Sequence, residues 1–489
     1  MIINRLNRRC VEVLFLLMTA IIGNAQTDTI HYDMQTILNM AKKQSLYAYE
    51  VESIRKNAVS NYKLFKAELL PQVNASINIP NYNQTFREIV QPDGGIQFQS
   101  IEQNNSSVNL GITQRIAKTG GQLFLQSDLQ RFDDFANNSQ LYNGIPFRIG
   151  FYQPIGAFNL YKWKKKIEPL KLEESTRQYN MELEAINGRA LFYFFELLLS
   201  DVNLQIAGYN KTINENLLKI ADERLELGKI SKSDRLQLQF ELNSAKKNYL
   251  KAKYLLKSVT DDLNAFLGKR ANDETILLQI PDDLPKIVVD YELALQKALK
   301  NRPALLRYER ELLESQMNID KAKKENGLNA SLFASFGFAR GATNIEDIYK
   351  DPQREKQLSL QINIPLVDWG KRKEFMAIAE RDASFLHQKI KHEQLDFENR
   401  IKQVVELFHQ LEEEVELQKE GKSVASQRFE ISRQRYVLGN ISITELAIAQ
   451  KEKDQSQRDY IFSLRDYWLT FYELRRLTGY DFVKHTQLH

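Results

Sequence analysis

The chain has 489 residues, 67 basic and 63 acidic side chains, and a formal net charge of +4 at pH 7. This near balance argues against nucleic acid as the partner, because nucleic-acid binding favours clustered positive charge. Mean hydropathy is −0.45, and beyond the N-terminal segment no apolar run near eighteen residues is evident, which excludes a helical inner-membrane protein.

The N-terminal segment has the layout of a secretory signal peptide. Three arginines precede a short apolar stretch from Val11 to Ile22, and Gly23-Asn24-Ala25 follows as a cleavage signal. We expect residues 1–25 to be removed; a membrane anchor is the alternative, but the apolar run is too short to span. The only cysteine, Cys10, lies inside this segment. The mature chain is therefore expected to have no lipid anchor, disulfide or thiolate chemistry.

Five segments alternate apolar with small or polar side chains and predict strands. A hairpin is expected around Thr119-Gly120-Gly121, with a strand from Leu123 to Leu129 after it, whereas Tyr82 to Gln103 is expected to be a loop. Strands with one apolar and one polar face fit either a half-buried soluble sheet or a transmembrane barrel. The five predicted strands cover residues 73–79, 108–113, 147–152, 332–338 and 358–364.

Aromatic residues beside lysines follow two of the predicted strands. Trp163 lies within a run of lysines after Pro154, and Trp369 precedes Lys371 after Pro365. Tryptophan with adjacent lysines at a strand end is typical of a membrane–water interface. The alternative is that both clusters are solvated helix starts.

Two long charged segments contain no proline, Leu170–Ile280 and Leu366 to the C-terminus. In the second, apolar residues recur at steps of three and four, which indicates one apolar stripe on a helix. A helix from about Lys371 to about Leu438 would be roughly 100 Å long at 1.5 Å per residue, so we expect helices packed as coiled coils. The apolar stripe comprises Phe397, Ile401, Val404, Val405, Phe408, Leu411 and Val415.

Both long segments contain the same turn, Leu227-Gly228-Lys229-Ile230-Ser231 and Leu438-Gly439-Asn440-Ile441-Ser442. Glycine is expected to end the outgoing helix in a left-handed conformation. Ser231 or Ser233, and Ser442 or Thr444, are candidates to cap the returning helix, with Asp234 and Glu445 in its first turn.

These turns belong to an internal repeat with an offset of 211 residues. Between 224–268 and 435–479, ten of forty-five aligned pairs are identical, where a random register would give roughly three. The same offset relates Pro154 to Pro365. We therefore expect two copies of one strand-plus-helix unit. The predicted organisation is a first repeat over 26–268, a linker over 269–289, a second repeat over 290–479 and a tail over 480–489.

No pattern of residues predicts catalysis or a bound cofactor or metal. His387 and His392 are five residues apart and diverge on a helix, and neither a phosphate-binding glycine loop nor a nucleophile elbow occurs. The run Phe192-Tyr193-Phe194-Phe195 is expected to serve helix packing. We therefore do not expect an enzyme.

The duplicated strands, very long helices and Leu-Gly-x-Ile-Ser hairpins resemble the TolC-like outer-membrane channel family, over about Tyr32 to Gly479. The resemblance also rests on Pro154 and Pro365 and on Leu69-Leu70-Pro71 before the first strand. It implies an α + β fold in which a long antiparallel helical coiled-coil barrel in the periplasm joins a transmembrane β-barrel shared between three protomers. Each protomer of the homotrimer would give four strands to a twelve-stranded barrel, and the hairpin around Gly120-Gly121 departs from that count.

The resemblance also implies roles at the periplasmic end of the tunnel. The hairpin tips would receive a periplasmic adaptor (membrane fusion) protein that links the channel to an inner-membrane transporter. Asp234, Tyr436 and Glu445 match aperture positions, whereas Ile448 and Ile441 stand where the family has an acidic residue and an arginine, so neither its double acidic ring nor its latch is kept. The implied docking residues are Leu227, Gly228, Ile230, Ser231, Leu438, Gly439, Ile441 and Ser442.

We therefore expect a passive exit duct in the outer membrane, in contact with lipid, that serves efflux or type I secretion. The competing hypothesis is a periplasmic or surface coiled-coil structural protein with a soluble sheet. The sequence does not indicate which substrate, pump or adaptor such a duct would serve.

Overall fold

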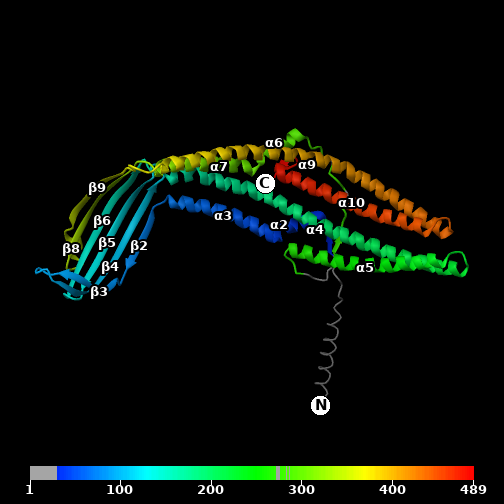
Figure 1. The fold of residues 1–489 in the computed structure, drawn as a ribbon, viewed down its shortest axis with the longest axis horizontal. Helices are drawn as coiled ribbons and strands as arrows, with labels where there is room; N and C mark the ends of the chain where they lie inside the picture. The colour runs from blue at the N-terminus through cyan, green and yellow to red at the C-terminus, as the bar shows by residue number, and fades with distance from the viewer. Residues whose placement is uncertain (1–29, 271–275, 282, 286, 489) are drawn as a thin grey trace, which may run out of the picture. The chain divides into compact units, whose positions relative to one another are not determined.

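The computed structural model describes residues 30–270, 276–281, 283–285 and 287–488. The predicted signal peptide lies outside these residues. Long helices and long strands make up the fold, as Figure 1 shows. The helices are α2 (Met34–Gln44), α3 (Leu46–Glu68), α4 (Leu160–Glu226), α5 (Lys232–Phe266), α6 (Tyr291–Asn301), α7 (Pro303–Glu325), α8 (Asp347–Lys350), α9 (Lys371–Leu438) and α10 (Ile443–Thr478).

Most of the strands form one sheet, and the others pair as two short ladders. The large sheet holds β2 (Gln72–Asn78), β3 (Tyr82–Val90), β4 (Ile96–Ile116), β5 (Gly121–Asp134), β6 (Ser139–Ile155), β8 (Asn329–Ala342) and β9 (Gln353–Asn363). The short ladders pair β1 (Ile30–Tyr32) with β7 (Ile276–Leu278), and β10 (Tyr480–Asp481) with β11 (Thr486–Gln487).

The long helix predicted from Lys371 to Leu438 is confirmed as α9, with 68 residues. Its counterpart α4 has 67 residues and begins at Leu160, which is 211 residues before Lys371. Helices α5 and α10 also begin 211 residues apart, at Lys232 and Ile443. These equal spacings support the internal repeat, whose boundaries stay a prediction.

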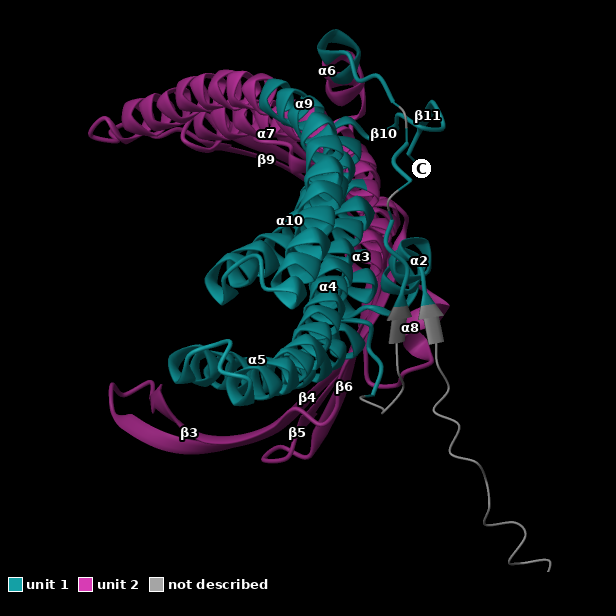
Figure 2. Cartoon of the chain, turned by 90° about the vertical axis from the view of Figure 1, so that its right-hand side faces the viewer, with its two compact units in different colours: residues 1–51, 181–294, 401–489 teal, residues 52–180, 295–400 magenta. Residues whose placement is uncertain are grey.

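The chain divides into two compact units that do not follow the predicted repeats, because each unit takes segments from both (Figure 2). Unit 1 comprises residues 1–51, 181–294 and 401–489, and unit 2 comprises residues 52–180 and 295–400. The regular elements in the described part of unit 1 are helices and the short ladders, and unit 2 contains the large sheet.

The core of unit 1 confirms two packing predictions. The α9 stripe from Ile401 to Val415 is buried at each of its apolar positions in this unit. Phe194 and Phe195 are also buried, and the Tyr193 ring stacks on Phe266 with ring centroids 4.6 Å apart. Phe194 and Phe195 therefore serve helix packing, as the sequence predicted, whereas Phe192 of the same run is exposed.

One described helix, α4, contains an 18-residue window apolar enough to cross a membrane by length and composition. The expectation that the sequence holds no such stretch was therefore wrong. Half of that window is buried within the structure. Leu191, Leu197 and Leu198 of α4 lie in the unit 1 core.

The sheet of unit 2 confirms all five predicted strands and the hairpin around Gly120-Gly121. Its strand order is β2-β4-β5-β6-β8-β9, with antiparallel pairing throughout. The loop expected over Tyr82–Gln103 is wrong, because β3 pairs with the first half of β4 while β2 pairs with the second half. The turn between β3 and β4 is closed by Gly94, whose φ is 83°.

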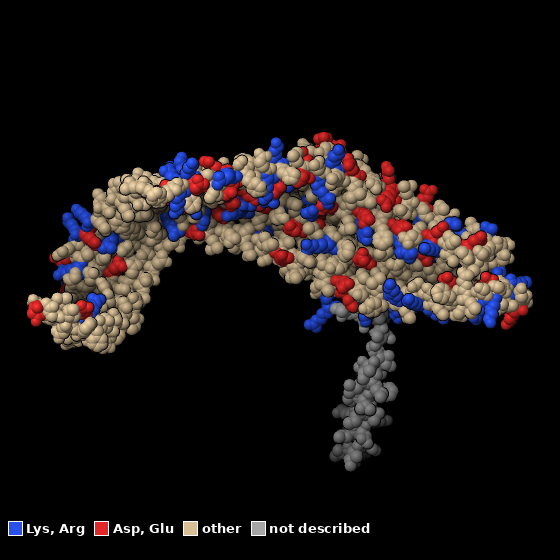
Figure 3. Space-filling model, in the orientation of Figure 1, with Lys and Arg blue, Asp and Glu red and all other residues tan. Residues whose placement is uncertain are grey.

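The register of the sheet gives it one apolar and one polar face. Adjacent partners form an apolar row across β2, β4, β5, β6 and β8, Val73–Ile112–Leu125–Ile149–Phe336, and the row ends at Lys356 on β9. The neighbouring row on the other face is Asn74–Gly111–Gln126–Arg148–Gly337–Glu355. Figure 3 shows mixed charge along the helices.

The predicted linker, residues 269–289, lies partly outside the described residues. Its described part includes β7, which pairs in parallel with β1. Helix resumes after the linker in α6, and Pro303 occupies the first turn of α7, where its missing N–H costs no hydrogen bond.

Candidate functional site: the two hairpin tips

Both hairpins of unit 1 turn through the same backbone structure. Gly228 and Gly439 have φ angles of 67° and 85°, a left-handed conformation that favours glycine. The N–H of Lys229 donates to the carbonyl of Arg224 at 2.8 Å, and that of Asn440 to Arg435 at 2.9 Å. This six-to-one hydrogen bond defines a Schellman cap, which satisfies carbonyls left open at a helix end. The glycine caps predicted from the sequence are confirmed.

The returning helices begin with serine caps. Ser231 accepts a hydrogen bond from the N–H of Asp234 at 3.1 Å, and Ser442 accepts one from Glu445 at 3.2 Å. These two serines, rather than Ser233 and Thr444, are thus the caps. The Asp234 carboxylate also accepts from the backbone N–H of Ser231 at 3.1 Å, which completes a capping box.

The two tips pack on one another within unit 1. Ile230 and Ile441, which occupy equivalent positions in the two turns, both contact one hydrophobic cluster and are partly buried. The cluster is formed by the buried side chains of Leu217, Ala221, Leu238, Phe429, Tyr436, Ile443, Leu446 and Ala449. Leu227 and Leu438, in contrast, are exposed beyond the cluster.

Arg224 connects the first hairpin to the end of α9. Its guanidinium donates to the carbonyl of Tyr436 at 3.3 Å and also to the carbonyl of Val437, and it lies 5.7 Å from the Tyr436 ring. The C-terminal carbonyls of a helix carry partial negative charge, which favours a cation there. Sequence reasoning missed this contact, although Arg224 and Arg435 were an identical pair of the repeat.

The three predicted aperture residues lie in different surroundings. Tyr436 is buried, and this burial raises the pKa of its hydroxyl above the ordinary value. The Asp234 carboxylate is held in the capping box. Glu445 contributes its backbone N–H to the Ser442 cap, and its side chain is exposed. Ile448 is exposed one turn further along α10.

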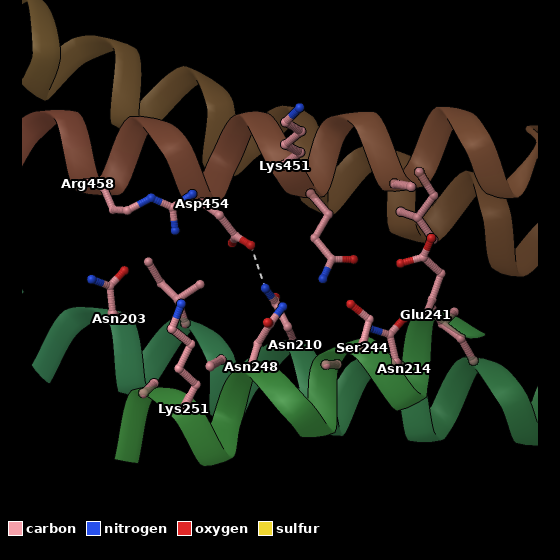
Figure 4. Close-up of a pocket in the computed structure, with 18 of the residues that line it drawn as sticks. Asn203, Asn210, Asn214, Glu241, Ser244, Asn248, Lys251, Lys451, Asp454 and Arg458 are labelled. Atoms are coloured by element: carbon pink, nitrogen blue, oxygen red, sulfur yellow. Dashed lines mark hydrogen bonds between the residues drawn. The ribbon is translucent and has the colours of Figure 1, made fainter. Parts of the chain in front are cut away.

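A polar cavity of about 490 Å³ lies between α4, α5 and α10 in unit 1 (Figure 4). Asp454 and Asn210 point toward each other across it and are joined by a hydrogen bond of 2.5 Å. Next to Asp454, the buried Lys453 ammonium lies 4.2 Å from the Tyr209 ring and 4.5 Å from the Phe429 ring. Burial lowers the pKa of Lys453 and raises the pKa of Asp454.

The two tryptophans predicted as membrane-interface anchors differ in unit 2. The Trp163 indole N–H donates to Asp320 at 3.0 Å, so this side chain also holds α4 against α7. Trp369 is 95 % exposed and has a φ of 53°, just before α9. Among the residues that the structure describes, no group of three or more metal-binding side chains is found.

Comparisons with known proteins agree with this architecture. Residues 294–480 match the sequence family described as outer membrane efflux protein. No curated protein matches the chain in sequence. CusC has 14 % identity and a TM-score of 0.65, with 94 % of this chain and 95 % of CusC covered. The CmeC channel of Campylobacter jejuni has 12 % identity and a TM-score of 0.66, with 91 % and 85 % covered.

VceC of Vibrio cholerae has 12 % identity and a TM-score of 0.62, with 91 % of this chain and 96 % of VceC covered. At these identities the similarity establishes the fold, which is that of outer-membrane channels. The sequence match in the second half of the chain and this fold confirm the predicted resemblance to the TolC-like outer-membrane channel family. Residues 294–480 are thus similar in sequence to outer membrane efflux proteins, and the chain has the fold of outer-membrane channels.

Proposed function

We propose that the protein is a passive exit duct that works as a homotrimer with a periplasmic adaptor and an inner-membrane pump, in efflux or type I secretion. The observation that carries the proposal is the sheet of unit 2, which has two chemically different faces and two unpaired edges. Its apolar side chains Val73, Leu110, Ile149 and Leu360 are exposed. A soluble sheet would bury such a face, whereas a barrel wall turns it toward lipid.

The sheet edges require more than one chain. Within the described residues β2 and β9 end the strand order, so each has an edge without a partner in this chain. In a bilayer no water satisfies the backbone groups of an open edge, and closed barrels are the sheets that span membranes. Pairing of β9 with β2 of a neighbouring copy closes the ring.

The helices of unit 1 support the same assembly. On α9, four apolar side chains spaced seven residues apart are each more than half exposed. On α5, four more exposed apolar residues fall at steps of four, ten and four, which also fit a heptad. Stripes of this spacing pack against another helix. They are Leu417, Val424, Ile431 and Leu438 on α9, and Leu236, Phe240, Leu250 and Tyr254 on α5.

The hairpin tips are proposed as the adaptor-docking and gating site. The exposed Leu227 and Leu438 and the open space around Gly228 leave apolar surface for an adaptor hairpin. The exposed carboxylate of Glu445 would form a ring of three acids at the aperture and attract cations. Arg224, bound to the end of α9, would hold the closed arrangement, and opening would be a shift of helix pairs.

Ion conduction tests this proposal. The protein is extracted from outer membranes in mild detergent and added to a planar lipid bilayer. We expect uniform conductance steps from the wild-type protein. The variant Val424→Asp with Ile431→Asp should give none, because charges on the heptad stripe prevent assembly.

The matched control is Ser423→Asp with Gln434→Asp, which adds the same charges at exposed positions of α9 beside the stripe. This control should conduct like the wild type. Equal conduction by the stripe variant and the wild type, or none by any of the three, would contradict the proposed duct.

A further inference from the structure

The sheet holds one more pair of strands in the first half of the chain than in the second. Helices α3 and α7 each have 23 residues, and α4 and α9 have 67 and 68, so the flanking helices correspond. Between α7 and α9 the sheet receives β8 and β9. Between α3 and α4 it receives β2, with its continuation β3, and then β4, β5 and β6. The additional pair is β4 and β5.

The additional pair lies within the sheet and not beside it. β5 pairs with β4 from Ile116↔Gly121 to Gln103↔Asp134, and with β6 on its other side. Without β4 and β5, β2 would lie next to β6. The first half of the chain would then give two adjacent strands, as the second half does with β8 and β9. The six strands β2, β4, β5, β6, β8 and β9 are thus one continuous wall.

The additional pair also carries the same two faces as the other strands. Leu123 of β5 pairs with Phe151, which pairs with Ala334, which pairs with Leu358, so this row is apolar from β5 to β9 and ends at Gln114 on β4. Leu110 and Leu123 are exposed on the apolar face. On the opposite face Asp128 accepts hydrogen bonds from Asn109 and Gln126. A plug or an extracellular flap would have water on both sides and no reason for the apolar row.

The polar face is also continuous across the sheet. Arg148 on β6 pairs with Glu355 on β9 at 2.6 Å, across the intervening Gly337 on β8. A Cβ at Gly337 would lie 2.5 Å from the carbonyl oxygen of Phe147 and 2.9 Å from the Cα of Arg148. Glycine therefore permits the ion pair to bridge three strands on the face away from the apolar row.

We infer that three copies of this chain close an eighteen-stranded barrel, six strands from each, in place of the twelve strands that the family resemblance implied. The inference rests on the proposed function, which supplies the trimer and the membrane. The diameter of a barrel grows roughly in proportion to its strand number. The membrane pore is then about half as wide again as a twelve-stranded one, and an even number of antiparallel strands is the usual closed form.

Single thiols on the two faces test the inference. The one cysteine of the chain, Cys10, precedes the expected cleavage site, so an introduced cysteine is the only thiol of the mature protein. Leu110→Cys and Leu123→Cys report the apolar face of the additional pair, and Thr113→Cys reports its polar face. The matched controls on β9 are Leu360→Cys and Gln361→Cys. Each assembled protein is labelled with an environment-sensitive fluorophore and placed in vesicles that contain nitroxide-labelled lipid.

We expect the lipid nitroxide to quench the label at positions 110 and 123 within about twofold of position 360. Labels at 113 and 361 should instead be quenched by aqueous iodide. If positions 110 and 123 report water while 360 reports lipid, the additional pair lies outside the wall and the eighteen-stranded barrel is wrong, although the duct stands. If position 360 itself reports water, the proposed function fails. Two apolar-face variants on different strands guard against one that does not fold.

Discussion

The two hairpin tips share a backbone but differ in what their side chains do. Each has a left-handed glycine, a six-to-one hydrogen bond and a serine cap. Arg224 of the first tip binds carbonyls at the end of α9, whereas Arg435, its repeat equivalent, is exposed. Asp234 is held in a capping box, whereas the Glu445 side chain is exposed.

The two copies of the hairpin therefore differ in the contacts of their charged side chains. Local sequence determines the turn, and both copies keep it. In the first copy, Arg224 and Asp234 make structural hydrogen bonds. In the second copy, the Glu445 side chain is exposed to solvent. We therefore propose the latch for the first tip and the aperture charge for the second.

The largest effect on export is expected when both tips are changed at once. Gly228→Asp with Gly439→Asp places a charged side chain on each tip at a positive φ, which aspartate tolerates at a modest cost. We expect export to be lost while the trimer still assembles, because the apolar docking surface becomes acidic. Export of a pump substrate from cells is measured beside the amount of trimer in the outer membrane.

The matched control is Gly421→Asp, at an exposed glycine of α9 with open space around it. It should export normally. Intact export by the double tip variant, with normal assembly, would show that the tips do not dock the adaptor.

The next largest effect is expected on stability, from the buried pair Lys453 and Asp454 on α10. At the repeat-equivalent positions the first hairpin has a buried Leu242 and an exposed Asn243, where the second has Lys453 and Asp454. Lys453→Leu leaves the Asp454 charge unpaired in a buried site and should cost about 3–5 kcal/mol of stability. Lys453→Leu with Asp454→Asn, which copies the first hairpin, should be close to neutral. Thermal unfolding of the trimer measures both, and equal loss in the two variants would refute the pairing.

These pKa shifts also predict how the pair responds to pH. Because burial raises the pKa of Asp454 in the folded state, its protonation stabilises the fold at low pH, and this contribution is lost as the pH rises through the folded pKa. Asp454→Asn should therefore remove a part of the stability change seen on going from acidic to neutral pH. Unfolding midpoints measured at several pH values compare the variant with the wild type. An identical pH profile for the two proteins would contradict the assignment.

Arg224→Ala tests the latch. Hydrogen bonds from a charged donor contribute about 1.5–3 kcal/mol each, so their loss should raise the open probability in planar bilayers about tenfold or more. Arg435→Ala, the equivalent change in the other tip, should alter it less than twofold. Similar behaviour of the two variants would remove the distinction between the tips.

The smallest effect concerns the caps. Ser231→Ala disrupts a two-way capping box, whereas Ser442→Ala removes a single hydrogen bond to the backbone. Each should cost about 1 kcal/mol, with the larger loss at Ser231. Unfolding midpoints of the two variants, compared with Ser233→Ala as a control that caps neither helix, measure the difference. A larger loss at Ser442 would contradict the reciprocal box.

The features that local sequence determines were predictable. Helix α9, the glycine caps and the alternating strands follow from periodicity and from residues that adopt special backbone angles. Strand β3 was missed because its polar and apolar residues follow no clean alternation and the Pro92–Gly95 turn was taken as part of a loop. Arg224 was missed as a latch because its partners are more than 200 residues away in the chain.

The central claim is that three copies of this chain form one duct in the outer membrane, and the mass of the native particle tests it most directly. The particle is extracted from outer membranes in mild detergent, and the detergent contribution is subtracted. We expect the mass of three mature chains, with little protein in the soluble periplasmic fraction. A soluble monomer or dimer would contradict the account and favour a periplasmic coiled-coil protein.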